Sequence, residues 1–113
     1  MKQIIIDEES NLIATLGNNA KENTQLVKDT NLSNPSYVWF HLDGVPSPHL
    51  IVHSEHLEKK HVIQAASYVK NYSANRYRNL HKIKVNYIEV KFVKPTHTMG
   101  QVTLLKKPKT VTV

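Results

Sequence analysis

The segment Val38–Val52, VWFHLDGVPSPHLIV, constrains the fold of this chain more than any other stretch. Two apolar runs, Tyr37–Leu42 and Leu50–His53, flank a loop that contains one glycine and two prolines. Because glycine and proline favour turns and interrupt strands, this pattern predicts two strands joined by the loop. Alternate side chains of a strand lie on opposite faces, so the role of each residue here depends on the face it occupies.

The rest of the pattern predicts an α+β domain that opens with a hairpin. The strands Gln3–Asp7 and Asn11–Leu16 are separated by three turn residues and form this N-terminal β-hairpin. A first helix starts at Asn18 or Asn19 and ends near residue 30. Asn19 and Glu22 have capping-box spacing, which favours a helix start at this point.

A longer helix and several strands complete the prediction. Glu58–Tyr72 carries apolar residues at helical spacing and forms the main helix. The segment 83–92 alternates like a strand but changes phase between Tyr87 and Ile88, where a β-bulge would absorb one residue. The last two strands are Gln101–Leu105 and Thr110–Val113. We expect one domain, residues 1–113, with a mainly antiparallel or mixed sheet and two α-helices.

Trp39, His41 and His49 have side chains suited to recognition or catalysis. The histidines stand at the two ends of the central loop, and Trp39 is the only tryptophan. If Phe40 faces the core, alternation puts Trp39 and His41 on the other side, where His41 and His49 can meet. In the alternative interpretation, Trp39 is buried under the long helix and the histidines only brace the loop.

The composition limits the compartment and the class of protein. The chain has no cysteine, which excludes disulfides and thiolate metal sites and fits a reducing compartment. The first residues lack the apolar core of a signal peptide, and no apolar run approaches the roughly 18 residues that span a bilayer. We therefore expect a cytoplasmic protein that binds no membrane.

Positive charge is concentrated in the second half of the chain. Residues 1–56 hold three lysines and seven acidic residues, whereas residues 57–113 hold twelve lysines or arginines and two glutamates. The halves carry −4 and +10, which together give the net charge of +6. A half-chain at +10 is a candidate footprint for a polyanion, and the alternative is a solvated basic face without a partner.

Cations and tyrosines are interleaved around the end of the long helix. Arginine and lysine neutralise phosphates, and exposed aromatic rings stack on unpaired bases. Tyr72 belongs to the apolar stripe and is expected to be buried, whereas Tyr68 and Tyr77 are expected to be exposed. The cations here are Lys70, Arg76, Arg78, His81, Lys82 and Lys84. A second cluster near the C-terminus consists of Lys94, His97, Lys106, Lys107 and Lys109.

The histidines also raise a catalytic and a metal-binding hypothesis. His41, Asp43 and His49 have the residue types of an acid–base cluster, since a carboxylate can fix the tautomer of a histidine. Their spacing matches no catalytic motif, and hydrogen bonding that holds the loop is the simpler interpretation. Zinc spacing such as HExxH is absent from the series His41, His49, His53, His56 and His61. We expect no catalytic residue, no metal and no cofactor.

Six short segments, in order, resemble the NFACT RNA-binding domain, also called NFACT-R. LGNNAKEN (Leu16–Asn23) is similar to the family's stretch at a helix start, and VWFH (Val38–His41) is similar to its Asp-Ile-Trp-Phe-His strand. The other four segments are VPSPHLIV (Val45–Val52), QAASYVKNYS (Gln64–Ser73), IKVNYIEVKFVKP (Ile83–Pro95) and MGQV (Met99–Val102).

This sequence departs from the family pattern at the central loop. The residues Ser47-Pro48-His49-Leu50 stand where the family usually has Gly-Ser-His-Val, and Pro48 removes a backbone donor just before His49. If the loop binds a phosphate through its amides, this copy binds it differently. Tyr37 also replaces the family's usual acidic residue before the strand.

The resemblance implies an RNA-binding module without catalysis. The domain forms the later part of larger NFACT ribosome-quality-control factors and also occurs as small standalone proteins, which this chain resembles. The implied partners are structured RNA such as tRNA or ribosomal RNA, and the ribosome. Because this sequence lacks the other domains of the larger factors, the resemblance implies the binding module and does not extend to peptide-tail synthesis.

We predict three groups of site residues. Most of the affinity would come from cations: Lys70, Arg76, Arg78, Lys82 and Lys84. Trp39, His41 and His49 would shape a recognition pocket. Asn18, Asn19 and Asn23 would lie at a helix N-terminus, a natural place for a phosphate.

Two alternatives remain: a histidine-dependent nuclease or hydrolase using His41, Asp43 and His49, and a protein- or DNA-binding domain. A free terminal strand would also allow a homodimer by sheet extension.

Overall fold

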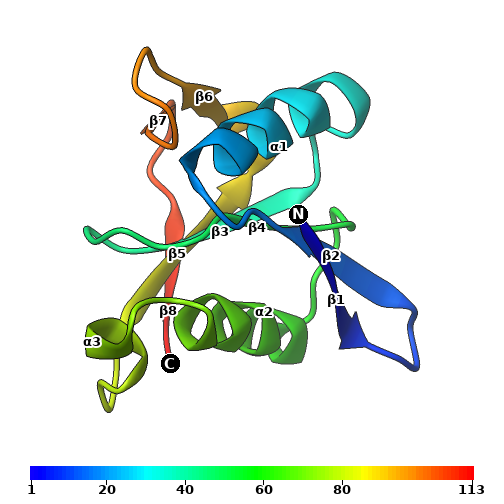
Figure 1. Cartoon of the computed structure of the whole chain (residues 1–113). Coiled ribbons are helices and arrows are strands. Elements are labelled where there is room, and N and C mark those ends of the chain that lie inside the picture. Colours follow the sequence, from blue (N-terminus) through cyan, green and yellow to red (C-terminus); the bar gives the residue numbers. More distant parts are fainter.

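The computed structural model describes residues 1–113 and shows an α+β domain built on a six-stranded antiparallel sheet (Figure 1). The strand order is β1-β2-β4-β3-β5-β8. These strands are β1 (Lys2–Asp7), β2 (Leu12–Leu16), β4 (Leu50–Val52), β3 (Val38–Leu42), β5 (Lys84–Glu89) and β8 (Lys109–Thr112). The predicted fold class is confirmed, as is the N-terminal hairpin of β1 and β2.

The two long helices cover opposite faces of this sheet, as Figure 1 shows. Helix α1 (Ala20–Ser33) lies on one side and α2 (Lys59–Asn71) on the other. Because successive side chains of β3 point to opposite faces of the sheet, this strand contributes side chains to both hydrophobic cores. Phe40 packs in the larger core with α2, whereas Trp39 packs in the smaller core with Leu26 and Val27 of α1.

The prediction of a β-bulge between Tyr87 and Ile88 is wrong. Strand β5 pairs with β3 without a register shift from Val85 to Glu89. The change of phase has another cause, because β5 is covered on both faces: Tyr87 packs against the core under α2 and Ile88 against the core under α1. A bulge does occur in this sheet, between Ile5 and Asp7 of β1.

Three elements in the second half of the chain differ from the expected ones. The predicted strand at Gln101–Leu105 forms, as β7 (Val102–Leu104), but it pairs with β6 (Val93–Pro95) in a separate two-stranded sheet. A short 3-10 helix, η1 (Val90–Phe92), carries the chain from β5 into β6. A third helix, α3 (Asn75–Arg78), follows α2 where only a loop was expected. No helix is long and apolar enough to cross a bilayer.

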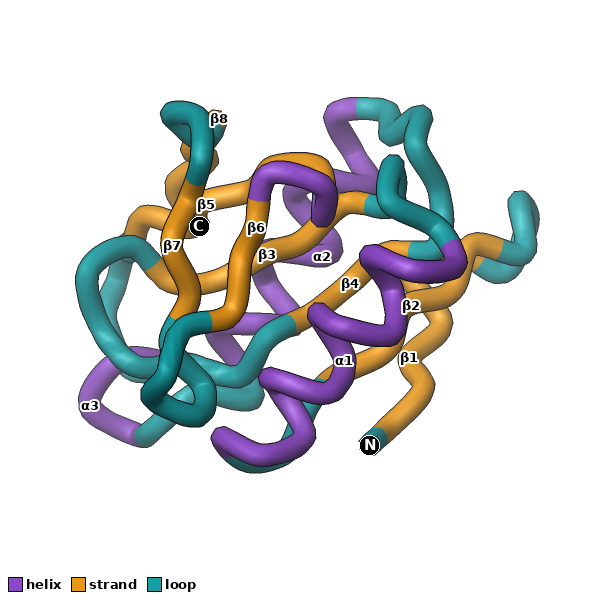
Figure 2. Tube along the Cα trace, turned by 90° about the horizontal axis from the view of Figure 1, so that it is seen from above, coloured by secondary structure: helices purple, strands orange, loops and turns teal.

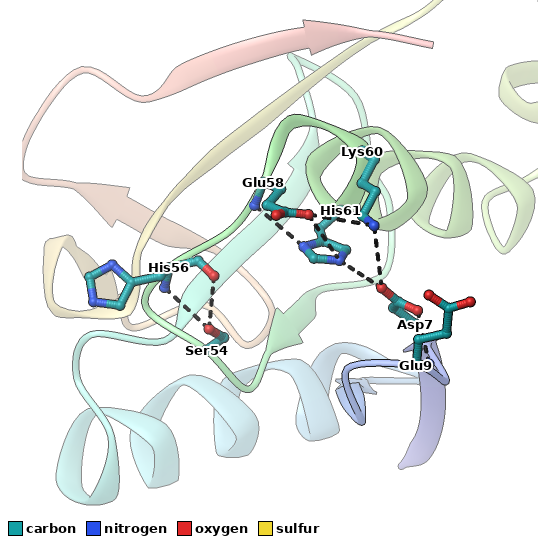
Figure 3. Close-up of polar contacts among 7 residues, drawn as sticks. All are labelled: Asp7, Glu9, Ser54, His56, Glu58, Lys60 and His61. Carbon is teal, nitrogen blue, oxygen red and sulfur yellow. Dashed lines mark hydrogen bonds and ion pairs between the residues drawn. The ribbon is translucent and has the colours of Figure 1, made fainter.

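A polar cluster ties the first hairpin to the start of α2 (Figure 3). His61 is 7% exposed, and its Nε2 lies 2.9 Å from Oδ2 of Asp7. Its Nδ1 accepts the backbone N–H of Glu58 at 3.3 Å, so Nε2 carries the proton and donates to Asp7. This hydrogen bond from His61 is the largest cause that lowers the pKa of the Asp7 carboxyl. Lys60 adds a weaker ion pair to Asp7 at 3.9 Å.

The same figure shows a second, exposed pair just before α2. The Ser54 hydroxyl donates to the carbonyl of His56, whose N–H donates back to that hydroxyl. This turn and the Asp7–His61 contact together fix the path of the chain from β4 into α2.

Candidate nucleic-acid interface

A cleft of about 850 Å³ opens where four segments of the chain converge. Its lining comes from the start of α1, the central loop, the α2–α3 junction and the β6–β7 loop. Figures 1 and 2 both show the central loop, α3 and the β6–β7 loop at the left end of the molecule. The predicted residues Asn18, Asn19, Asn23, Trp39, His41 and His49 all line this cleft.

Trp39, His41 and His49 form one aromatic cluster at the floor of the cleft. The indole Nε1–H of Trp39 donates to Nδ1 of His49 at 3.1 Å. The His41 ring stacks on the indole with centroids 5.5 Å apart, and it meets the His49 ring edge-on at 5.0 Å. The expectation that the two histidines meet at the loop mouth is therefore confirmed. Trp39 is 2% exposed, under α1 rather than under the long helix, and His49 is 1% exposed.

The hydrogen bonds of this cluster fix the tautomers of both histidines. Nδ1 of His49 accepts from Trp39, so its Nε2 carries the proton. Burial lowers the pKa of His49 from 6.5 to about 3, helped by the neighbouring His41 and opposed by the Gly100 backbone. Nδ1 of His41 lies 2.6 Å from the Leu42 carbonyl, so Nδ1 donates and Nε2 is left as an acceptor. Burial also lowers the pKa of His41, so both rings are neutral at pH 7.

Asn19 and Asn23 have structural roles at the start of α1. Asn19 caps the helix, since its side chain accepts the N–H of Glu22 at 2.9 Å. The buried Asn23 accepts the backbone N–H of His49 through Oδ1 at 3.2 Å. A Cβ added at Gly17 would lie 2.0 Å from that Oδ1. The Asn23 side chain therefore holds the backbone of His49 in place, and Gly17 leaves the space that this side chain occupies.

The helix start already holds a carboxylate. The Glu22 Oε1 accepts the backbone N–H of Asn18 at 3.1 Å. The same oxygen pairs with the N-terminal ammonium of Met1 at 2.9 Å, so a phosphate would have to compete with a carboxylate that already occupies the helix start. The phosphate-binding role of Asn18, Asn19 and Asn23 stays a prediction.

The predicted cations lie beside the cleft rather than in its lining. Arg76 and Arg78 are exposed on α3, which directly follows the cleft residues Tyr72, Ser73 and Ala74. Lys82, between α3 and β5, and Lys84, the first residue of β5, are also exposed. Lys70 is half-buried, and its Nζ donates to the Val113 carbonyl at 3.2 Å, so it is partly engaged within the fold.

The tyrosines are arranged differently from the expectation. Tyr72 is 42% exposed and lines the cleft, so the expectation that it is buried is wrong. It sits at the end of α2, where the helix has already passed the edge of the core. Tyr68 and Tyr77, expected to be exposed, are half-buried and pack against the larger core. The guanidinium of Arg76 lies 4.8 Å from the ring centre of Tyr77.

The acid–base cluster of the nuclease hypothesis is not assembled. The Asp43 carboxylate accepts from the side-chain amide of Asn86 at 3.0 Å and contacts neither His41 nor His49. Away from the cleft, His53 bonds to the Thr15 hydroxyl at 2.8 Å. No group of three or more histidine, aspartate or glutamate side chains is arranged to hold a metal ion.

The β6–β7 loop also lines the cleft, and the sequence analysis did not predict its residues as part of the site. Met99, Gly100 and Gln101 line it, and the Gly100 N–H donates to the Thr24 hydroxyl of α1 at 2.7 Å. Gly100 has φ +81°, and a Cβ there would lie 2.9 Å from Cβ of Ala20. The only signal for this loop in the sequence is the MGQV segment of the family resemblance.

Comparison with known families and structures identifies the class of domain. A model of the NFACT protein RNA binding domain matches residues 2–106. The chain therefore belongs to the NFACT RNA-binding domain family, and membership supports a general RNA-binding role. A direct search of curated proteins found no match.

A solved structure shows the same fold. The C-terminal part of the fibronectin/fibrinogen-binding protein from Streptococcus suis superimposes with a TM-score of 0.82 at 22% sequence identity. The match covers 94% of this chain and 42% of that one, so the present chain spans less than half of that structure. At this identity the likeness establishes the fold alone.

Proposed function

We propose that this domain binds structured RNA such as tRNA or ribosomal RNA, in the cytoplasm and in connection with translation or ribosome-associated quality control. It acts by binding and not by catalysis. The observation that carries the proposal is the position of the α3 arginines, which are exposed and directly follow the cleft residues Tyr72–Ala74. Together with Lys82 and Lys84, they offer an RNA backbone four exposed cations on segments that adjoin the cleft lining.

Arginine suits this role because its planar guanidinium binds phosphate in two-point geometry and remains charged. Arg76 is also held against the Tyr77 ring, which limits the rotamer freedom lost on binding. Neutral His41 and His49 would not add to this charge, so we assign phosphate affinity to α3 and the following segment.

The test is fluorescence anisotropy of labelled tRNA over a salt series, beside duplex DNA of equal length. Single-stranded contacts give a log–log salt slope of about −0.7 per phosphate, so five contacts predict about −3.5. The double change Arg76→Ala/Arg78→Ala is expected to reduce the slope to about −2. Lys28→Ala/Lys59→Ala is the matched control, since it removes two exposed charges from other parts of α1 and α2.

The outcomes separate the alternatives. Preference for tRNA over DNA, with a flattened slope only in the arginine variant, supports the proposal. Equal binding of DNA would favour a general polyanion surface, and absence of binding at low salt would refute the RNA role. Cleavage of the labelled RNA would instead revive the nuclease hypothesis.

A further inference from the structure

The lining of the cleft is free of charge, which is unusual in so charged a chain. None of its 24 lining residues is lysine, arginine, aspartate or glutamate. At the chain-wide frequency of 21% charged residues, a lining of 24 would hold about five. The two lining histidines are neutral at pH 7, because burial lowers both of their pKa values.

A charge-free cleft is a poor place for a phosphate. An anion taken out of water needs a cation or several donors, and no lysine or arginine lines the cleft. The cleft is better suited to a neutral group that carries both donors and acceptors. Its volume of about 850 Å³ lies within the roughly 300–1,000 Å³ of small-molecule sites.

The polar groups of the cleft match the edge of a nucleobase. Nε2 of His41 is an acceptor without a protein partner, and every buried side-chain nitrogen or oxygen of this structure has a partner. This Nε2 is therefore open to solvent and free to accept from a base. Amide side chains, which donate and accept as base edges do, line the same cleft at Asn18 and Gln101, while the lining amide of Asn86 donates to Asp43.

The cleft also has the apolar surface that a base requires. Met99 lines it and is 58% exposed, while Val45 and Pro46 line it from the central loop. Tyr72 also lines it and is 42% exposed, although its ring stacks on Tyr68 at 6.4 Å and lies 4.7 Å from the Lys2 ammonium. An aromatic ring and a thioether both pack well on the flat face of a base. A base that entered the cleft would cover apolar surface of these side chains that now faces water, which is favourable.

We propose that the cleft binds one unpaired nucleobase of the RNA, while the cations of α3 hold the phosphates outside it. This inference rests on the proposed RNA-binding function and gives the cleft a distinct role within it. Base binding here uses no charged contact, so its contribution to affinity is independent of salt. The phosphate contribution, by contrast, depends steeply on salt.

The test compares two labelled oligoribonucleotides of equal length and charge, one with mixed bases and one abasic, by anisotropy over a salt series. We expect the base-containing strand to bind more tightly at every salt concentration, with the same slope for both. Tyr72→Ala is expected to weaken only the base-containing strand, by about 5- to 150-fold, the range for loss of one stacking partner. Met99→Ala should act in the same direction.

A control variant and the pattern of outcomes distinguish a failure of base binding from a failure of RNA binding. Leu32→Ala removes an 88% exposed apolar side chain of α1 outside the cleft and should change neither strand. Equal affinity for both strands, or a loss in Tyr72→Ala that is the same for both, overturns base binding while leaving RNA binding intact. Failure of both strands to bind at low salt overturns the proposed function itself.

Discussion

Replacement of His49 by asparagine tests the buried aromatic cluster most sharply, through the dependence of stability on pH. Asparagine has an acceptor oxygen that can take the place of Nδ1 and accept from Trp39, but it does not titrate. The pKa of His49 falls from 6.5 in the unfolded chain to about 3 in the folded one because the ring is buried. A folded-state pKa below the unfolded value means that stability is lost as pH falls below 6.5, down to about 3.

The size of this loss follows from the gap between the two pKa values. One pKa unit corresponds to about 1.4 kcal/mol, and pH 5.0 lies 1.5 units below the unfolded pKa of 6.5. His49 alone should therefore cost about 2 kcal/mol of unfolding free energy between pH 7.5 and pH 5.0. His41 and His53, whose pKa values are also lowered by burial, act in the same direction in both proteins.

The assay is urea unfolding at pH 7.5 and 5.0, followed by far-UV circular dichroism. Wild type should lose about 2 kcal/mol more than His49→Asn over this interval, whatever the variant's stability at pH 7.5. Carboxylates contribute equally to both proteins and cancel in the comparison. If the two proteins lose the same free energy, His49 is not held neutral by burial, and the assigned tautomers are wrong.

Three further substitutions test other contacts of the fold. Trp39→Phe leaves Nδ1 of buried His49 without a donor and should cost about 1–3 kcal/mol in urea unfolding, followed by circular dichroism because the only tryptophan is lost. Gly17→Ala forces a Cβ against Asn23 and should destabilise by about 1–3 kcal/mol; an unchanged melting temperature would show that Asn23 can move away freely. Asp7→Asn removes a carboxyl whose lowered pKa stabilises the fold above that pKa, so the variant's unfolding midpoint should fall less than that of wild type as pH drops below 4.

The sequence was sufficient for the elements whose signals are local. Asn19 and Glu22 set the start of α1, and apolar spacing set α2, because capping and amphipathic periodicity need only neighbouring residues. The phase change at Tyr87 and Ile88 was misread because a strand covered on both faces loses simple alternation. Whether β7 joins the main sheet or pairs with β6 depends on tertiary placement, which no local pattern records.

The grouping of the aromatic residues around the central loop could be predicted, but their burial could not. The sequence indicated Trp39, His41 and His49 as one group, and the structure brings them into contact. Their burial against α1 could not be read from the segment, since it depends on which helix covers which face of β3. The contribution of Gly100 and the exposure of Tyr72 follow from how the β6–β7 loop and the end of α2 meet across the cleft.

An NMR titration of the ¹⁵N-labelled domain with tRNA would test the central claim, RNA binding at the cleft and α3, most directly. Every segment concerned has backbone amides that would report binding, including those of Gly44 and Gly100 in the cleft and of residues 75–78 in α3. We expect shifts at these amides, with the β1–β2 turn at residues 8–11 unchanged as an internal reference. Shifts confined to the sheet edges β1 or β8, or no shifts at low salt, would contradict the assignment of this face to RNA.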